Sequence, residues 1–112
     1  MALLTTGNGL PNVVVTGVAM TTALATDADN TWKNLLDGQS GIRLLDDPFV
    51  EQYDLPVRIG GHLLEEFDSQ LNKVENRRMS YLQKMATVLG RRVWESAGSP
   101  DVDACGPDGC EI

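Results

Sequence analysis

Histidine, cysteine and aromatic residues are scarce in this chain. Its 112 residues include one histidine, two cysteines, and two each of tryptophan, tyrosine and phenylalanine. Catalysis by two cooperating imidazoles is therefore excluded within these residues. The single histidine, His62, follows Gly60 and Gly61, and we interpret it as a loop residue. We predict no catalytic residue in this chain.

The two cysteines also lack the setting that metal or thiol chemistry needs. Cys105 and Cys110 lie near the end of the chain, separated by four residues. That spacing fits neither the zinc-binding C-x2-C pair nor the thioredoxin-type redox pair. We predict no metal site and interpret both cysteines as incidental thiols, with a short disulfide-closed loop as the alternative.

Long apolar runs are absent as well. No stretch approaches the roughly 20 apolar residues of a membrane span. Residues 1–9 carry no basic residue and too short an apolar stretch for a secretory signal peptide. We therefore predict a single small cytoplasmic domain without a membrane span.

Positive charge is scarce overall but concentrated in one segment. The net charge is −7, yet residues 73–92 carry six basic residues against one acid, which leaves −12 on the rest. Such asymmetry predicts a basic face for an acidic partner. The segment has one aromatic residue, Tyr81, and the remaining acids would repel phosphate. We therefore predict no nucleic-acid partner.

The first half of the chain predicts one strand and one helix. Residues 11–20 form a β-branched run typical of a strand buried on both faces. A helix is expected to follow, with Thr26 as N-cap, and to stop at Gly38. Its apolar side would carry Trp32, Leu35 and Leu36. Residues 46–53 are expected to be irregular, and residues 1–10 flexible.

A second, longer helix is predicted near the end. It is expected to start between Glu75 and Met79, to end at Ala97, and to be capped by Gly98. Its apolar face would comprise Leu82, Met85 or Ala86, Leu89, Val93 and Ala97. Because a lone strand has no ladder partner for its N–H and C=O groups, we expect a marginally stable or aggregation-prone chain.

Three stretches, in this order, carry a resemblance to a known family. They are the strand-like Val13-Val14-Val15-Thr16-Gly17, the helix leading into Gly38-Gln39-Ser40-Gly41-Ile42, and Arg77-Arg78-Met79 before the helix that closes at Trp94-Glu95-Ser96-Ala97-Gly98. Together they resemble the N-terminal end of the β-ketoacyl-(acyl-carrier-protein) synthases of the KAS II-like type. Residues 49–63 look most like the branch that elongates meromycolate chains for mycolic acids. The resemblance covers residues 11–103.

The resemblance implies an incomplete fold. Family members have a thiolase-like fold of two related halves and form homodimers, and they are much longer than this chain. The expected fold class is therefore α/β, a truncated N-terminal portion of a thiolase-like fold with one buried strand, two helices and irregular connections. Homodimer formation is doubtful for such a portion.

The resemblance also implies an activity for a longer protein. The parent would be a 3-oxoacyl-(acyl-carrier-protein) synthase, an acyltransferase of fatty-acid biosynthesis that condenses an acyl thioester with malonyl-carrier protein and releases carbon dioxide. The family's nucleophilic cysteine and two histidines would lie beyond residue 112, so this chain is expected to be inactive. No cofactor is implied, because phosphopantetheine arrives on the acyl carrier protein. Two alternatives are a small carrier-protein-binding module and a half-subunit complemented by a separate catalytic chain.

Basic residues are the candidate site residues that the resemblance implies. In the family, positive residues just before and at the start of the long helix dock the acidic carrier protein. Arg77 and Arg78 match them, and Lys73 is a nearby addition. Guanidinium groups grip carboxylates bidentately, which suits a transient encounter. For Lys84, Arg91 and Arg92 we favour a solvated helix face instead.

The resemblance is lost after Asp103. Residues 104–112 contain glycine, proline and acids, which do not build the buried strand that the family has there. We expect a disordered, non-homologous tail and hypothesise that it is read out of frame. The gene's nucleotide sequence tests this: the hypothesis fails unless another frame continues the resemblance.

Overall fold

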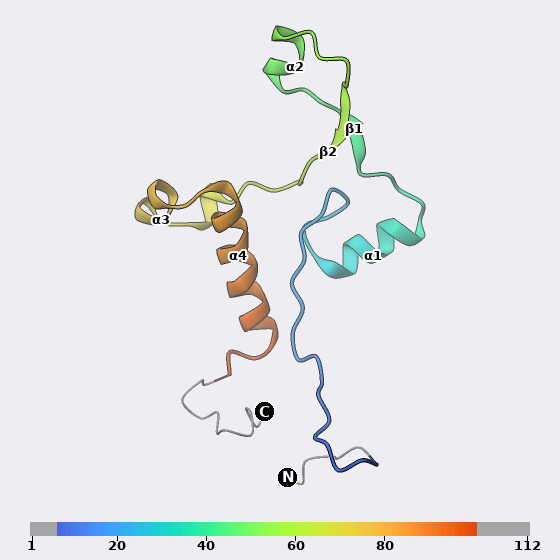
Figure 1. Ribbon diagram of the computed structural model, residues 1–112, viewed down its shortest axis with the longest axis vertical. Helices are drawn as coiled ribbons and strands as arrows, with labels where there is room; N and C mark the ends of the chain where they lie inside the picture. The colour runs from blue at the N-terminus through green and yellow to red at the C-terminus, as the bar shows by residue number, and fades with distance from the viewer. Residues whose placement is uncertain (1–6, 101–112) are drawn as a thin grey trace.

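Short elements connected by long irregular segments make up an open structure (Figure 1). The computed structural model describes residues 7–100. In chain order the elements are α1 (Ala28–Leu36), β1 (Ile42–Leu44), α2 (Pro48–Gln52), β2 (Ile59–Gly61), the 3-10 helix η1 (Asp68–Gln70), α3 (Lys73–Arg78) and α4 (Tyr81–Ser96). The radius of gyration is 19.7 Å, whereas a compact domain of about 100 residues has about 13 Å. The buried apolar residues of the described part are Ala25, Val50, Phe67 and Val88.

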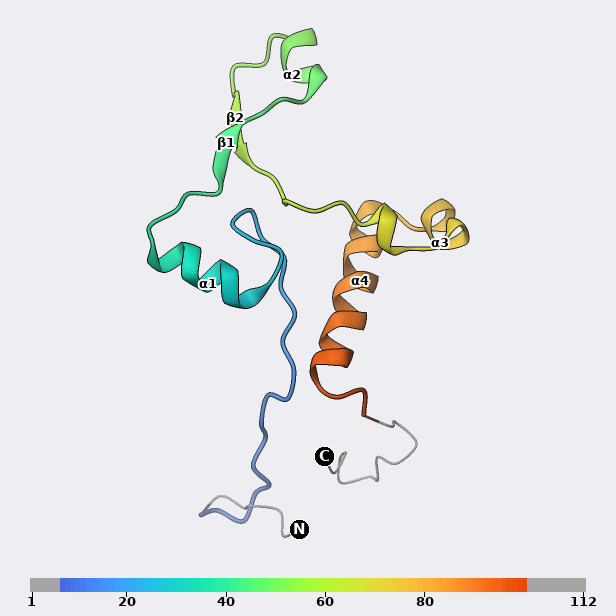
Figure 2. The same cartoon turned by 180° about the vertical axis from the view of Figure 1, so that it is seen from behind.

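The predicted buried strand does not form. Of the expected strand, Pro11 forms a single bridge and residues 12–20 belong to no sheet. Val13, Val14 and Val15 are 93%, 74% and 83% exposed. The physical reason is the missing ladder partner, because the sheet within residues 7–100 consists of β1 and β2 alone. Both views of the molecule show this segment passing between α1 and α4 without a strand arrow (Figures 1 and 2).

Helix α1 begins one residue later than predicted. Asp27, not Thr26, is the N-cap, and its Oδ1 accepts a hydrogen bond of 2.8 Å from the backbone N–H of Asn30. This hydrogen bond lowers the pKa of the Asp27 carboxyl. The stop at Gly38 is confirmed, since its φ is +70°. The expected apolar residues of this helix, Trp32, Leu35 and Leu36, are exposed.

A small hairpin with an inserted helix occupies the middle of the chain. Strands β1 and β2 are antiparallel, with Ile42 opposite Gly61 and Leu44 opposite Ile59. The connection between them contains α2, where an irregular stretch was expected. Pro48 opens α2 in its first turn, where its missing N–H costs nothing. Val50 of this helix is buried.

The predicted long helix is two helices. Met79 has extended backbone angles, φ −102° and ψ 140°, and it separates α3 from α4. Ser80 then caps α4: its Oγ accepts from the N–H of Gln83, whose side chain accepts from the N–H of Ser80. The predicted end is confirmed, with α4 ending at Ser96 and Gly98 at φ +85°.

The apolar face of α4 is only partly covered. Val88, which lies outside the predicted face, is the buried residue of this helix, whereas Leu82 is 66% exposed. Near its start, the rings of Tyr81 and Phe67 lie 5.7 Å apart between centroids.

Two of the sequence predictions concern residues that lie wholly or partly outside residues 7–100. Of the expected flexible N-terminus, only residues 7–10 are described, and the expected tail 104–112 with both cysteines lies outside the described residues. Among the helices of residues 7–100, none combines the length and apolarity needed to cross a membrane.

Candidate docking surface

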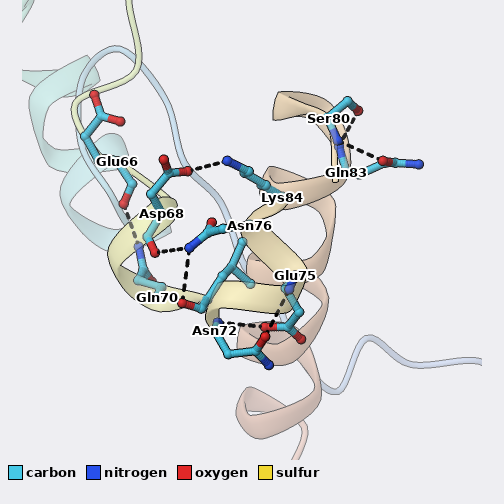
Figure 3. A network of polar contacts seen from close by, with 10 residues as sticks. Glu66, Asp68, Gln70, Asn72, Glu75, Asn76, Ser80, Gln83 and Lys84 are labelled. Carbon is cyan, nitrogen blue, oxygen red and sulfur yellow. Dashed lines mark hydrogen bonds and ion pairs between the residues drawn. The ribbon is translucent and has the colours of Figure 1, made fainter. Parts of the chain in front are cut away.

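A capping box fixes where α3 begins. The Asn72 side chain accepts hydrogen bonds from the N–H groups of Val74 and Glu75, each at 2.9 Å. In return, Glu75 Oε2 accepts from the Asn72 N–H at 3.0 Å (Figure 3). Arg77 and Arg78 therefore fall in the last turn of this six-residue helix, where cations are favoured by the helix dipole.

Asn76 attaches α3 to the preceding turn. Its Nδ2 donates to the carbonyl oxygens of Asp68, at 2.8 Å, and Leu71, at 3.3 Å (Figure 3). These two bonds connect the middle of α3 with the η1 region across five and eight residues. The capping box thus fixes the start of α3, and the Asn76 side chain fixes the middle of α3 against the η1 region.

Two cations of α4 are neutralised by the segment before it. Lys84 Nζ lies 2.6 Å from Asp68 Oδ1 (Figure 3), and the Lys84 side chain is only 15% exposed. Arg91 pairs with Glu75 in the same way. The hydrogen bond from Arg91 is the main cause of a lowered pKa of the Glu75 carboxyl. Because Lys84 and Arg91 are seven residues apart, they lie on one side of α4.

Arg92 makes the most extensive contacts of the basic residues. Its Nη1 and Nη2 donate to the two carboxylate oxygens of Glu65 at 2.8 and 2.6 Å. Nη2 also donates to Gln70 Oε1 at 2.7 Å, and Nη1 to the Thr26 carbonyl at 3.4 Å. Hydrogen bonding by Arg92 is the main cause that lowers the pKa of Glu65 from 4.5 to about 2. Arg92 thereby joins α4 to segments before η1 and before α1.

The sequence alone favours a solvated helix face for Lys84, Arg91 and Arg92. This is wrong for Lys84 and Arg92; Arg91 is exposed but also forms an ion pair. Each has a carboxylate partner. No local pattern could have revealed the partners, because they lie 16 or 27 residues away rather than at helical i, i+4 spacing. The missed residues are Asp68, Glu75 and Glu65.

The predicted docking residues behave differently. Lys73, Arg77 and Arg78 are exposed, and within residues 7–100 no carboxylate lies in ion-pairing distance of them. The hydrogen bond from Arg77 Nε to the Lys73 carbonyl, 3.3 Å long, holds Arg77 along α3. The structure brings all three onto one short helix with their charges free to meet an external anion. Their docking role stays a prediction.

His62 follows β2 directly and is not part of α3. Its Nε2 is 3.4 Å from Asp47 Oδ2, and its side chain is 61% exposed. Within the described part of the chain no cluster of three histidine, cysteine or acidic residues could hold a metal ion. The geometry around His62 fits the loop role that the sequence predicts.

Comparison with known proteins agrees with the resemblance. A family model described as β-ketoacyl synthase, N-terminal domain, matches residues 11–110. The 3-oxoacyl-(acyl-carrier-protein) synthase 2 of Mycobacterium leprae is 75% identical over 100 residues, which cover 89% of this chain and 24% of that protein. The proteins of the same name from Mycobacterium bovis and Mycobacterium tuberculosis are 74% identical over 103 residues, 92% of this chain and 25% of theirs.

The chain thus spans about a quarter of the length of these relatives. The match of the family model begins at residue 11, where the sequence resemblance begins, and continues beyond Asp103 to residue 110. It includes α3 and α4 and all six basic residues of 73–92. With most of its residues matched, the chain belongs to the β-ketoacyl synthase family and carries sequence of its N-terminal domain.

Proposed function

We propose that this chain is the N-terminal part of a 3-oxoacyl-(acyl-carrier-protein) synthase of the fatty-acid elongation type with a thiolase-like fold, in the branch that serves mycolic acids. The identity of about three quarters to mycobacterial relatives of that name supports the proposal. In the longer protein the reaction is a decarboxylative condensation of an acyl thioester with malonyl-carrier protein. The part played by this chain is to dock the acidic carrier protein.

One observation carries the docking role: the basic residues of 73–92 fall into two groups. The three on α4 are occupied by carboxylates of the chain itself. The three on α3, which are Lys73, Arg77 and Arg78, are exposed and unpaired within the described residues. A partner with acidic side chains therefore meets free charge at α3 but not at α4. Two neighbouring guanidinium groups at a helix end suit a transient, charge-steered encounter.

Titration of the purified chain with an acidic acyl carrier protein tests this role. Binding is expected and is expected to weaken as salt is added. Arg77→Gln and Arg78→Gln should each reduce affinity roughly two- to fivefold, the effect of removing one exposed charge pair. The matched control is Arg43→Gln, an exposed arginine of β1, which should bind as the unchanged chain does. Equal loss in the control, or binding indifferent to salt, contradicts the docking role.

Carrier-protein binding by this chain should occur without condensing activity. The chain alone, supplied with acyl thioester and malonyl-carrier protein, should form no condensed product. Turnover that disappears on replacement of Cys105 or Cys110 by serine would overturn that part of the proposal.

A further inference from the structure

Helices α3 and α4 are joined by a link that does not by itself fix the angle between them. Met79 and Ser80 form the link, and both have extended backbone angles. A continuous helix would set the direction of α3, whereas an extended link leaves that direction open to rotation about its backbone dihedrals. The contacts that hold α3 against α4 therefore also decide where the exposed cations of α3 lie.

Glu75 connects the start of α3 with the middle of α4. Its Oε2 accepts a hydrogen bond of 3.0 Å from the Asn72 N–H, and its Oε1 accepts from Arg91 Nη2. The Glu75 side chain is 18% exposed, whereas that of Arg91 is 53% exposed. The carboxylate that joins the two helices is thus largely shielded from solvent, from which a partner would approach.

Asp68 makes a second connection between the same helices. Its carbonyl oxygen accepts from Asn76 Nδ2 of α3 at 2.8 Å, and its Oδ1 lies 2.6 Å from Lys84 Nζ of α4 (Figure 3). Lys84 and Arg91 are seven residues apart on α4, which corresponds to about 10 Å along a helix. A short helix held at two points so far apart cannot rotate about either of them.

We propose that Glu75 and Asp68 are positioning residues for carrier-protein docking, which hold α3 at the angle to α4 at which its cations meet the partner together. The inference rests on the docking role proposed above. If the charge of Glu75 alone mattered, its removal would strengthen the binding of an acidic partner, because one repelling carboxylate would be gone. The positioning role has the opposite consequence, since apparent affinity falls with the fraction of molecules in which α3 is correctly oriented.

Titration of Glu75→Gln with an acidic acyl carrier protein distinguishes these effects. Glutamine at this position of a capping box still accepts from the Asn72 N–H, so α3 keeps its start. Glu75→Gln, Asp68→Asn and Arg91→Gln should each weaken binding roughly two- to fivefold, the effect of losing one partly exposed ion pair. The double variant Glu75→Gln/Arg91→Gln should bind no more weakly than the weaker of its two single variants, because both changes remove one interaction.

Glu66→Gln is the matched control. It removes the same charge from the segment before η1, at an exposed residue that forms no ion pair within residues 7–100. Its binding should be unchanged or slightly tighter. An equal loss in this variant would assign the effect to net charge and overturn the positioning role.

Residual dipolar couplings, recorded without carrier protein, measure the angle of α3 independently. In the unchanged chain the amides of residues 73–78 and 81–96 should fit one common alignment. In Glu75→Gln and Asp68→Asn the couplings of residues 73–78 should become smaller, because α3 then samples several angles.

The outcomes separate this inference from the docking role. Absence of salt-sensitive binding by the unchanged chain would overturn the docking role and this inference with it. If the unchanged chain binds but Glu75→Gln binds equally well or more tightly, the positioning role alone is overturned. Weaker binding by Glu75→Gln with α3 still aligned would also overturn it, because Glu75 would then act on the partner directly.

Discussion

Arg92 on α4 binds both carboxylate oxygens of Glu65, at 2.8 and 2.6 Å, across 27 residues of sequence. The Glu65 side chain is 11% exposed and that of Arg92 32%. In a structure whose described part has so few buried apolar residues, this ion pair is a principal connection between α4 and the segment before η1.

Loss of either partner should loosen α4 from that segment. Glu65→Gln and Arg92→Gln are each expected to destabilise the contact by about 1.5–3 kcal/mol, the range for hydrogen bonds to charged groups. Hydrogen exchange of the amides in residues 62–70 measures the effect. The double variant should be less destabilised than the sum of the single variants, since both remove one interaction. Glu66→Gln, at an exposed neighbour, is the control; an equal effect there would contradict the specific role of Glu65.

The same contact should depend on pH in the acidic range. Because the pKa of Glu65 is lowered from 4.5 to about 2, the contribution of its carboxylate to stability is fully present above pH 4.5. It is lost as the pH falls from 4.5 through about 2, where the folded state takes up the proton. A carboxyl-carbon NMR titration gives the pKa directly. In Arg92→Gln the Glu65 value should return toward 4.5; an unchanged titration would contradict the assignment to Arg92.

Two glycines near α4 should respond in opposite ways to alanine. At Gly17 a Cβ would lie 2.7 Å from the Val93 carbonyl oxygen and 2.9 Å from the Ala97 nitrogen, so Gly17→Ala should detach the extended segment from α4. At Gly90, inside α4, a Cβ would meet nothing within 4 Å. Gly90→Ala should therefore stabilise the helix by about 0.5–1 kcal/mol. Circular dichroism and exchange of the Val18 amide measure the two effects, and stabilisation by Gly17→Ala would contradict the close approach.

Removal of the cap at Ser80 should shorten α4. Ser80 Oγ and the Gln83 side chain satisfy two N–H groups at the start of this helix, so Ser80→Ala should cost about 1 kcal/mol of helix stability. Helical content by circular dichroism against temperature gives the measurement. Ser69→Ala, at an exposed serine of η1, should leave the helical signal unchanged. Identical curves for the two variants would show that the capping box does not set the start of α4.

The elements that sequence could predict are those specified by nearby residues. The stops at Gly38 and Gly98 depend on a residue that adopts positive φ at a helix end. The interruption at Met79 is also local, since Ser80 and Gln83 form a capping box, but the continuous apolar pattern concealed it. A strand, in contrast, needs a partner, and the valines of residues 13–15 are exposed because none is present among the described residues.

In the candidate site, too, local features could be predicted from the sequence and contacts with distant residues could not. That Arg77 and Arg78 are surface cations could be predicted from a basic pair at a helix. That Lys84 and Arg92 form ion pairs could not be predicted, because their partners Asp68 and Glu65 lie in or before η1, far from them in the sequence. Among the described residues, tertiary ion pairs thus leave unpaired basic side chains on α3 but not on α4.

The proposed docking of an acidic carrier protein at α3 can be tested by recording the amide NMR spectrum of the isotope-labelled chain during titration with that protein. The largest shift changes should fall on residues 73–78, decline with added salt, and be reduced in Arg77→Gln and Arg78→Gln. Changes of equal size in those variants, or changes centred on α1 or the hairpin of β1 and β2, would contradict it.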